Sequence, residues 1–172
     1  RAIARELASA GAKVALHFNN NLAKAEETLT QLEGTGHILV QGNMTRPMDL
    51  VRMVDQAIEK LGKIDILVNN AGIYEEVDFL RMTYDAWQQA WKRTMDTNLT
   101  GGANLSFLVA NHMVEKGSGR IINISSRGAF RGEPTAFAYG ASKAGLNALG
   151  QSMAKALAPH NVFVFTVAPG WV

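Results

Sequence analysis

Tyr139 and Lys143 are the two residues of this 172-residue sequence whose types and spacing point most directly to chemistry. They stand four positions apart in AYGASKAGLNALG, a stretch built largely from Ala, Gly and Ser that predicts a helix with both side chains on one face. A cation a few ångströms from a phenol favours the phenolate and lowers the pKa of the hydroxyl. Such a phenol can give a proton to a carbonyl oxygen or take one from an alcohol. The alternative is an incidental surface pair.

Two further groups of polar residues lie where predicted strands end. The strand IINIS ends at Ser125 and Ser126, and Ser126 precedes Tyr139 by 139 − 126 = 13 positions. Because ligands bind at the carboxyl ends of strands in open parallel sheets, a hydroxyl there could hold a substrate oxygen beside the tyrosine. An earlier strand ends in NNAG at 69–72, where small residues admit a flat ligand and asparagines can pin neighbouring strand ends. Simple turns are the alternative for both stretches.

Strands and helices alternate along the sequence, and this order must position those residues. Apolar runs predict strands at 13–18, 37–42, 63–70, 119–126 and 161–167. Helical spacing of apolar residues predicts helices at 1–10, 22–32, 48–61, about 84–115, and 137–158. The strands are continuous Val- and Ile-rich runs, as in sheets that are covered on both faces. The pattern predicts an α/β fold with a doubly wound parallel sheet in three α/β/α layers, in one domain over residues 1–172.

Composition argues against several other classes of protein. The net charge is only +2 and the basic residues are scattered, so we expect no nucleic-acid partner. No apolar run approaches the roughly 18 residues of a membrane helix, so we expect no membrane segment. Cysteine is absent and the four histidines show no ligand spacing, so we expect no metal site. We interpret Trp87 and Trp91, one helical turn apart, as a packing pair, with a contact to a second subunit as the alternative.

Five motifs occurring in one order resemble the short-chain dehydrogenase/reductase family, in its compact single-domain branch. They are NNAG at 69–72, TNLTG at 97–101, NISS at 123–126, YGASK at 139–143 and VAPG at 167–170. The resemblance implies a Rossmann-type sheet and a catalytic set of four residues. In that set Tyr139 is the acid–base catalyst, and Lys143 tunes the tyrosine and binds the nicotinamide ribose. Ser126, favoured over Ser125 by its spacing, orients the substrate carbonyl, and Asn98 holds a water of a proton relay to the lysine.

The resemblance also implies an NADP or NAD cofactor and a small carbonyl or alcohol substrate. The stretch HFNNN at 17–21 lacks the acidic residue that bonds the ribose hydroxyls of NAD, which favours NADP, with Asn19 closest to the 2′-phosphate. Asn43 stands where the family usually has an aspartate that bonds the adenine amine, and an amide oxygen can accept the same bond. The other implied cofactor contacts are the Met44 backbone beside the adenine, Asn70, Ala71 and Gly72 beside the adenosine ribose, and Pro169, Gly170 and Val172 around the nicotinamide.

The opening RAIARELASAG resembles the helix that follows the family's Gly-rich phosphate loop, and we interpret the sequence as a fragment that is incomplete at both ends. We therefore expect the chain alone to bind cofactor poorly and to be inactive. For the full-length protein, the resemblance implies hydride transfer to or from a carbonyl, most like 3-oxoacyl-[acyl-carrier-protein] reduction. It further implies a homo-oligomer, a dimer or tetramer. The absence of cysteine fits a reducing compartment, and we expect a cytoplasmic location. The alternatives are a sugar or steroid dehydrogenase of the same family, an extended-branch epimerase or dehydratase, and a non-catalytic Rossmann-type binding protein.

Overall fold

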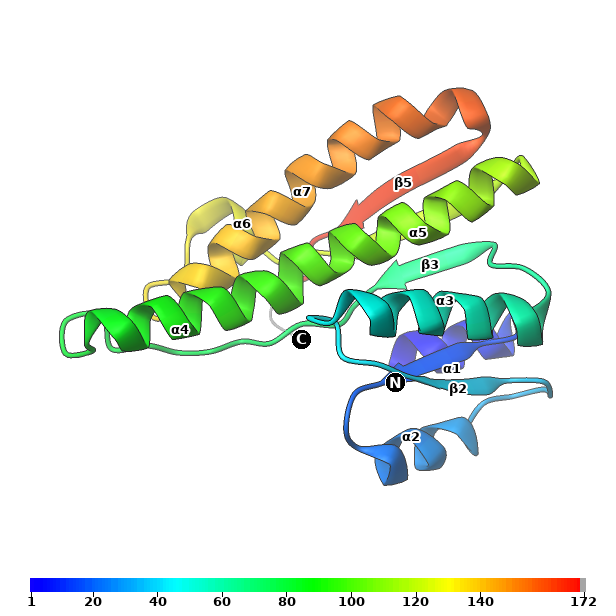
Figure 1. Cartoon of the computed structure of the whole chain (residues 1–172), viewed down its shortest axis with the longest axis horizontal. Helices are drawn as coiled ribbons and strands as arrows, with labels where there is room; N and C mark the ends of the chain where they lie inside the picture. The colour runs from blue at the N-terminus through cyan, green and yellow to red at the C-terminus, as the bar shows by residue number, and fades with distance from the viewer. Residues whose placement is uncertain (171–172) are drawn as a thin grey trace. The chain divides into compact units, whose positions relative to one another are not determined.

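The computed structural model describes residues 1–170 of the chain. These residues form two compact units, Arg1–Ile64 and a second that begins at Asp65, and strands alternate with helices in both (Figure 1). All strand pairs are parallel: β1 pairs with β2 in a two-stranded sheet, and β3, β4 and β5 form a second, three-stranded sheet in that order. The predicted α/β class with parallel sheets is confirmed, and the described strands lie in two sheets rather than in one.

The first unit contains α1 (Ala2–Ser9), β1 (Ala15–Phe18), α2 (Leu22–Leu29), β2 (Ile38–Gln41) and α3 (Pro47–Leu61). Asn21 caps α2, because its side-chain oxygen accepts a hydrogen bond from the Lys24 amide at 2.9 Å. Pro47 begins α3, where a missing amide hydrogen costs nothing. One cluster of its core contains buried Ala4, Ala8 and Leu32 with partly buried apolar neighbours, and the most deeply buried apolar residue of the unit is Leu50 of α3.

The second unit carries every residue of the predicted catalytic set. It contains β3 (Ile66–Asn69), α4 (Tyr84–Met95), a π-helical turn η1 (Asp96–Thr100), α5 (Gly101–Lys116), β4 (Gly119–Ile124), α6 (Gly128–Arg131), α7 (Phe137–Leu157), the 3₁₀ turn η2 (Ala158–His160) and β5 (Val162–Val167). In Figure 1, α4 and α5 run on as one long helical element, with α7 alongside. This arrangement places the carboxyl ends of β3 and β4 next to the first turns of α7.

Close backbone approaches hold α5 and α7 on one face of the three-stranded sheet. A Cβ on Gly119 would lie 2.7 Å from the Met113 Cβ of α5, so the strand touches this helix only because position 119 has no side chain. A Cβ on Gly150 of α7 would lie 2.9 Å from the Asn123 amide nitrogen of β4. Residues 119 and 123 share one face of β4, since side chains alternate along a strand.

Three features differ from the pattern predicted from the sequence. The predicted helix at 84–115 contains a π-helical turn, and the short helix α6 was not expected. Cover on both faces was expected for the strands, but Phe163 and Phe165 of β5 are 43% and 50% exposed. These two side chains point away from the face that α5 and α7 cover. Within residues 1–170, no helix is both long enough and apolar enough to cross a membrane.

Candidate active site

The first turns of α7 bring Tyr139 and Lys143 together. The Lys143 Nζ lies 5.7 Å from the centroid of the Tyr139 ring, as expected for side chains one helical turn apart. Only 5% of Lys143 is exposed, and its Nζ donates a hydrogen bond to the Ile124 carbonyl at the end of β4 (2.8 Å). Burial lowers the pKa of Lys143 below its ordinary value of 10.5, because desolvation penalises the ammonium form. The site therefore contains a fixed, buried cation beside a half-buried phenol.

Small residues allow α7 to come this close to the end of β4. A Cβ on Gly140 would lie 3.5 Å from the Gly128 carbonyl oxygen, so the helix packs directly on the backbone that follows β4. The hydroxyl of buried Ser142 donates to the Tyr139 carbonyl within the helix at 2.8 Å. The run of small residues around the Tyr–Lys pair thus has a packing role, which is to seat the lysine against the strand end.

The two neighbouring serines after β4 have different environments. Ser125 is 4% exposed, and its hydroxyl donates to the Lys143 carbonyl at 3.3 Å, which ties the strand end to α7. Ser126 is partly exposed, and its Oγ accepts a hydrogen bond from the Gly128 amide at 3.1 Å. A hydroxyl that accepts from the backbone keeps its own hydrogen for another acceptor. Of the two, Ser126 is the serine that could meet a substrate oxygen.

Asn98 lies in the π-helical turn and is 2% exposed. Its Oδ1 accepts from the Ile73 amide at 2.7 Å, and its Nδ2 donates to the Ile73 carbonyl at 2.9 Å and to the Ser142 hydroxyl at 3.2 Å. The side chain therefore clamps the segment after β3 and links it to α7. π-helical turns inside α-helices are frequent at functional sites. Since this amide is fully engaged, Asn98 acts here first as a structural link between the segment and the helix.

Replacing Asn98 by alanine would leave both backbone groups of Ile73 without these partners. We expect Asn98→Ala to lower the unfolding free energy by about 1–3 kcal/mol, the usual cost of an unsatisfied buried polar group. Thermal or urea unfolding of the full-length protein measures this loss. Asn104→Ala is the matched control, because Asn104 lies exposed on the following helix α5. Equal stability of the two variants would show that the clamp does not hold the segment.

Asn69 pins the ends of neighbouring strands, as the sequence suggested. Its buried Nδ2 donates to the Asn123 Oδ1 of β4 at 2.9 Å and to the Ser106 Oγ of α5 at 2.7 Å. The Asn69 Oδ1 and the Asn123 Nδ2 are buried without a hydrogen-bond partner. This polar layer lies at the carboxyl ends of β3 and β4 and joins both strands to α5.

Tyr74 is a residue of the site that was not predicted from the sequence. Its ring packs edge-to-face against the ring of Tyr139, with centroids 4.9 Å apart and an interplanar angle of 69°. The two residues are 139 − 74 = 65 positions apart, so no helical or strand periodicity relates them. The only signal in the sequence is the position of Tyr74 two residues after the NNAG motif.

The predicted cofactor residues of the second unit surround the same strand ends. A Cβ on Gly72 would lie 3.3 Å from the Asn98 Oδ1 and 3.5 Å from the Lys143 Nζ, so the bare backbone passes directly over the lysine. Pro169 lies beside the turn of Ser126, since its carbonyl accepts from the Arg127 amide at 3.0 Å. The remaining predicted contacts are Asn70 and Gly170, which are exposed, Ala71, which is partly buried, and Val172, which lies outside the described residues.

The other predicted cofactor residues belong to the first unit. Asn19 follows β1 and is exposed, and its carbonyl accepts from the Gln41 side chain at 3.0 Å. Asn43 follows β2, and its Oδ1 already accepts from both the amide and the hydroxyl of Thr45, each at 2.9 Å. The oxygen that was expected to bond an adenine amine thus closes the local turn. Met44 is buried.

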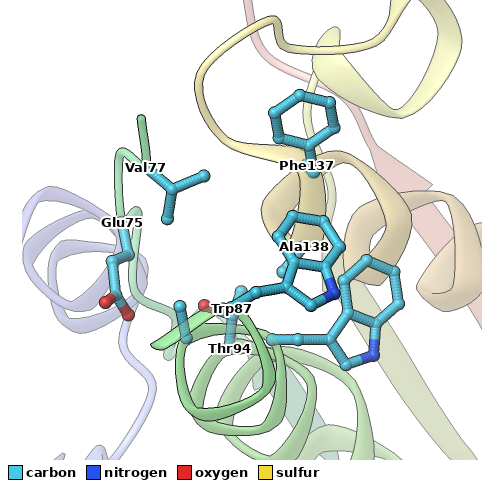
Figure 2. A pocket seen from close by; sticks show the side chains of 8 residues that line it. Glu75, Val77, Trp87, Thr94, Phe137 and Ala138 are labelled. Atoms are coloured by element: carbon cyan, nitrogen blue, oxygen red, sulfur yellow. The ribbon is translucent and has the colours of Figure 1, made fainter. Parts of the chain in front are cut away.

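A small hollow lies among α4, the segment after β3 and the start of α7 (Figure 2). Its lining includes Ala138 but neither Tyr139 nor Lys143. Trp87 and Trp91 of α4 stack with centroids 5.6 Å apart, and Trp87 also meets Phe137 of α7 edge-on at 5.7 Å. The two tryptophans contact each other, as interpreted from their spacing, and Trp87 also packs α4 against the start of α7. The alternative of a contact to a second subunit stays a prediction.

Comparison with known proteins agrees with this arrangement. The family model described as short chain dehydrogenase matches residues 1–172. The chain is 34% identical to the 3-oxoacyl-[acyl-carrier-protein] reductase of Synechocystis sp., over 100% of this chain and 69% of that relative. It is also 34% identical, with the same coverage, to the reductase of that name, FabG, from Staphylococcus aureus.

A solved structure shows the same fold. Acetoin dehydrogenase YohF from Salmonella typhimurium superposes with a TM-score of 0.86 at 29% identity, over 97% of this chain and 66% of that chain. The present chain thus spans about two thirds of the length of the proteins that it matches. The family model, the relatives and the Rossmann-type fold agree, and the chain belongs to the short-chain dehydrogenase family of oxidoreductases.

Proposed function

We propose that the full-length protein is an NADP-dependent oxidoreductase that reduces a carbonyl group, with Tyr139 as the general acid. The observation that carries the proposal is the contact between the half-buried Tyr139 phenol and the buried Lys143 cation, 5.7 Å from the ring centroid. Burial of the lysine charge costs free energy, and a tyrosine with a purely structural role would gain nothing that offsets this cost. A phenol that must release a proton to an oxygen at neutral pH does need a nearby cation.

Each residue of the catalytic set has a separate part in this proposal. Tyr139 donates its hydroxyl proton to the substrate oxygen, and Lys143 stabilises the negative charge that the phenol then carries. Ser126 donates its free hydrogen to the same oxygen and fixes its direction. Asn98 keeps the Gly72 segment in place over the lysine through its bonds to Ile73. In the reverse direction the same groups accept the proton of an alcohol.

The residues near the lysine fit a nicotinamide cofactor. Gly72 places bare backbone beside the lysine, since a Cβ there would lie 3.5 Å from the Lys143 Nζ and 3.3 Å from the Asn98 Oδ1, and a flat ligand can approach bare backbone closely. When bound, NADPH would supply the hydride to the carbonyl carbon. We propose that Asn70, Ala71, Gly72, Pro169 and Gly170 of the second unit hold it. The contacts expected at Asn19, Asn43 and Met44 of the first unit stay predictions.

Two further observations support a cofactor form and a substrate class. Residues 17–21 contain no acidic side chain that would repel a 2′-phosphate, which supports NADP over NAD. Two relatives that share a third of their residues with this chain are named 3-oxoacyl-[acyl-carrier-protein] reductases, which supports a 3-oxoacyl thioester as the substrate. The homo-oligomer and the cytoplasmic location stay predictions.

A panel of carbonyl compounds tests the proposal in the full-length protein. With a 3-oxoacyl thioester, we expect the protein to oxidise NADPH, which is measured by the loss of its absorbance. We expect NADH to be oxidised more slowly or not at all. The panel also contains acetoin, a sugar, a quinone and a ketosteroid, which represent the alternative substrates. Turnover of one of these compounds in place of the thioester would reassign the substrate class. Tight binding of NADPH without oxidation by any of them would instead support a non-catalytic binding protein.

A further inference from the structure

We propose that Tyr74 is a positioning residue that holds the phenol ring of Tyr139, an inference that rests on the proposed function of Tyr139 as the general acid. The two rings meet edge-to-face at 4.9 Å, which is a preferred arrangement of aromatic pairs. Lys143 Nζ is a second neighbour of the Tyr139 ring, at 5.7 Å from its centroid. The reactive phenol thus has an aromatic partner as well as a cation.

The backbone on both sides of Tyr74 is fixed by α4 and the turn that follows it. The Asn98 amide holds the amide and the carbonyl of Ile73, and the Arg93 guanidinium of α4 forms two hydrogen bonds with the Glu75 carboxylate. Two residues further on, the Val77 amide donates to the Thr135 carbonyl at 2.7 Å, in the loop that leads into α7. Tyr74 therefore stands on a segment that is tied to three parts of the second unit.

The exposure of Tyr74 makes a purely structural role a poor explanation. Its side chain is 48% exposed, so its ring covers Tyr139 without entering the core. An exposed tyrosine contributes little to stability through burial. The hydrogen bonds of its neighbours Ile73 and Glu75 fix the backbone at Tyr74, so its ring stays beside Tyr139. The position of the Tyr139 oxygen depends on the orientation of its ring, and small displacements of a reacting group reduce turnover strongly. Contact with Tyr74 restricts that orientation.

Three variants of the full-length protein test this role, with the substrate found by the panel. We expect Tyr74→Ala to lower kcat by about tenfold, as expected when a reactive group loses its positioning contact. The KM for the carbonyl substrate and the dissociation constant of NADPH should stay near the wild-type values. Tyr74→Phe keeps the ring and should restore kcat. Tyr84→Ala is the matched control, because Tyr84 is 72% exposed and its hydroxyl accepts a hydrogen bond from Gln88 of its own helix.

A double-variant cycle separates action through Tyr139 from independent effects. If Tyr74 acts by positioning the phenol, Tyr74→Ala should cause no further loss in a Tyr139→Phe background. An equal loss in both backgrounds would overturn the proposal. A raised KM with unchanged kcat would also overturn it, since that result indicates direct substrate contact. Loss of kcat that Tyr74→Phe does not restore would likewise contradict a role for the ring.

An NMR measurement gives a readout that does not depend on turnover. In protein labelled with ¹³C-tyrosine, we expect the ring resonances of Tyr139 to shift in Tyr74→Ala and to stay in place in Tyr84→Ala. If the Tyr139 resonances do not move in Tyr74→Ala, the proposal is wrong, whatever the activity. If they move but the wild-type protein oxidises no NADPH, the contact between the rings stands and the proposed function fails instead.

Discussion

Tyr139→Phe is expected to reduce the turnover of the full-length protein by about 10²–10⁴-fold, the usual contribution of general acid–base catalysis. The substitution removes one oxygen atom and keeps the ring, so the edge-to-face contact with Tyr74 is preserved. It also leaves the Lys143–Ile124 hydrogen bond and the Gly72 backbone as they are. We therefore expect the dissociation constant of NADPH, measured by fluorescence titration, to stay close to that of the wild-type protein.

Tyr84→Phe is the matched control for this prediction. It removes the same atom from an exposed tyrosine in the first turn of α4, where the hydroxyl accepts a hydrogen bond from the Gln88 side chain at 3.0 Å. Its turnover should equal that of the wild-type protein. Parallel losses of turnover and NADPH affinity in Tyr139→Phe would mean that the phenol serves cofactor binding. Undiminished turnover would remove Tyr139 from the chemistry altogether.

The sequence predicts the parts of this site that depend on local periodicity. Tyr139 and Lys143 are one helical turn apart, and a run of apolar residues marks the strand that ends at Ile124. Since 3.6-residue and two-residue periods decide which side chains share a face, the position of the pair at the start of a helix after a strand end follows from the sequence alone. The alternation of strands and helices was predicted for the same reason.

The parts that were not predicted depend on contacts between distant segments. The π-helical turn at Asp96–Thr100 carries Asn98, whose amide bonds the backbone of Ile73, 98 − 73 = 25 positions earlier. Nothing in the local sequence of an α-helix indicates such a tie. The contact between Tyr74 and Tyr139 arises in the same way, because it depends on where the Ile73 segment is held.

Asn43 shows that a local hydrogen bond can also escape prediction from the sequence. The residue type offers an acceptor for an adenine amine, but a side-chain amide near a threonine can also close a local turn. In the structure its Oδ1 accepts two hydrogen bonds from Thr45, so a residue type alone did not decide which partner the oxygen takes.

Lys143→Met is expected to affect catalysis and stability in different ways. The cation beside Tyr139 is lost, and removal of one preorganised electrostatic group typically lowers kcat by about 10²–10³-fold.

The effect on stability depends on pH, because burial lowers the pKa of Lys143 in the folded protein. Between this lowered pKa and 10.5, the folded protein binds fewer protons than the unfolded chain. The unfolding free energy of the wild-type protein therefore gains a contribution that rises with pH through this window. The methionine variant has no such contribution.

The sign of the pH dependence distinguishes this effect from simple loss of packing. The unfolding free energy of Lys143→Met minus that of the wild-type protein should fall as the pH rises from 7 toward 10.5, because the penalty of burying the ammonium disappears from the wild type. The unpaired Ile124 carbonyl of the variant adds a cost that is the same at every pH. Urea unfolding without cofactor, at several pH values, measures the difference. Lys155→Met, at an exposed position of the same helix, is the matched control. A flat difference for Lys143→Met would show that burial does not penalise the charge of this lysine, and the argument for a costly, functional cation would fail.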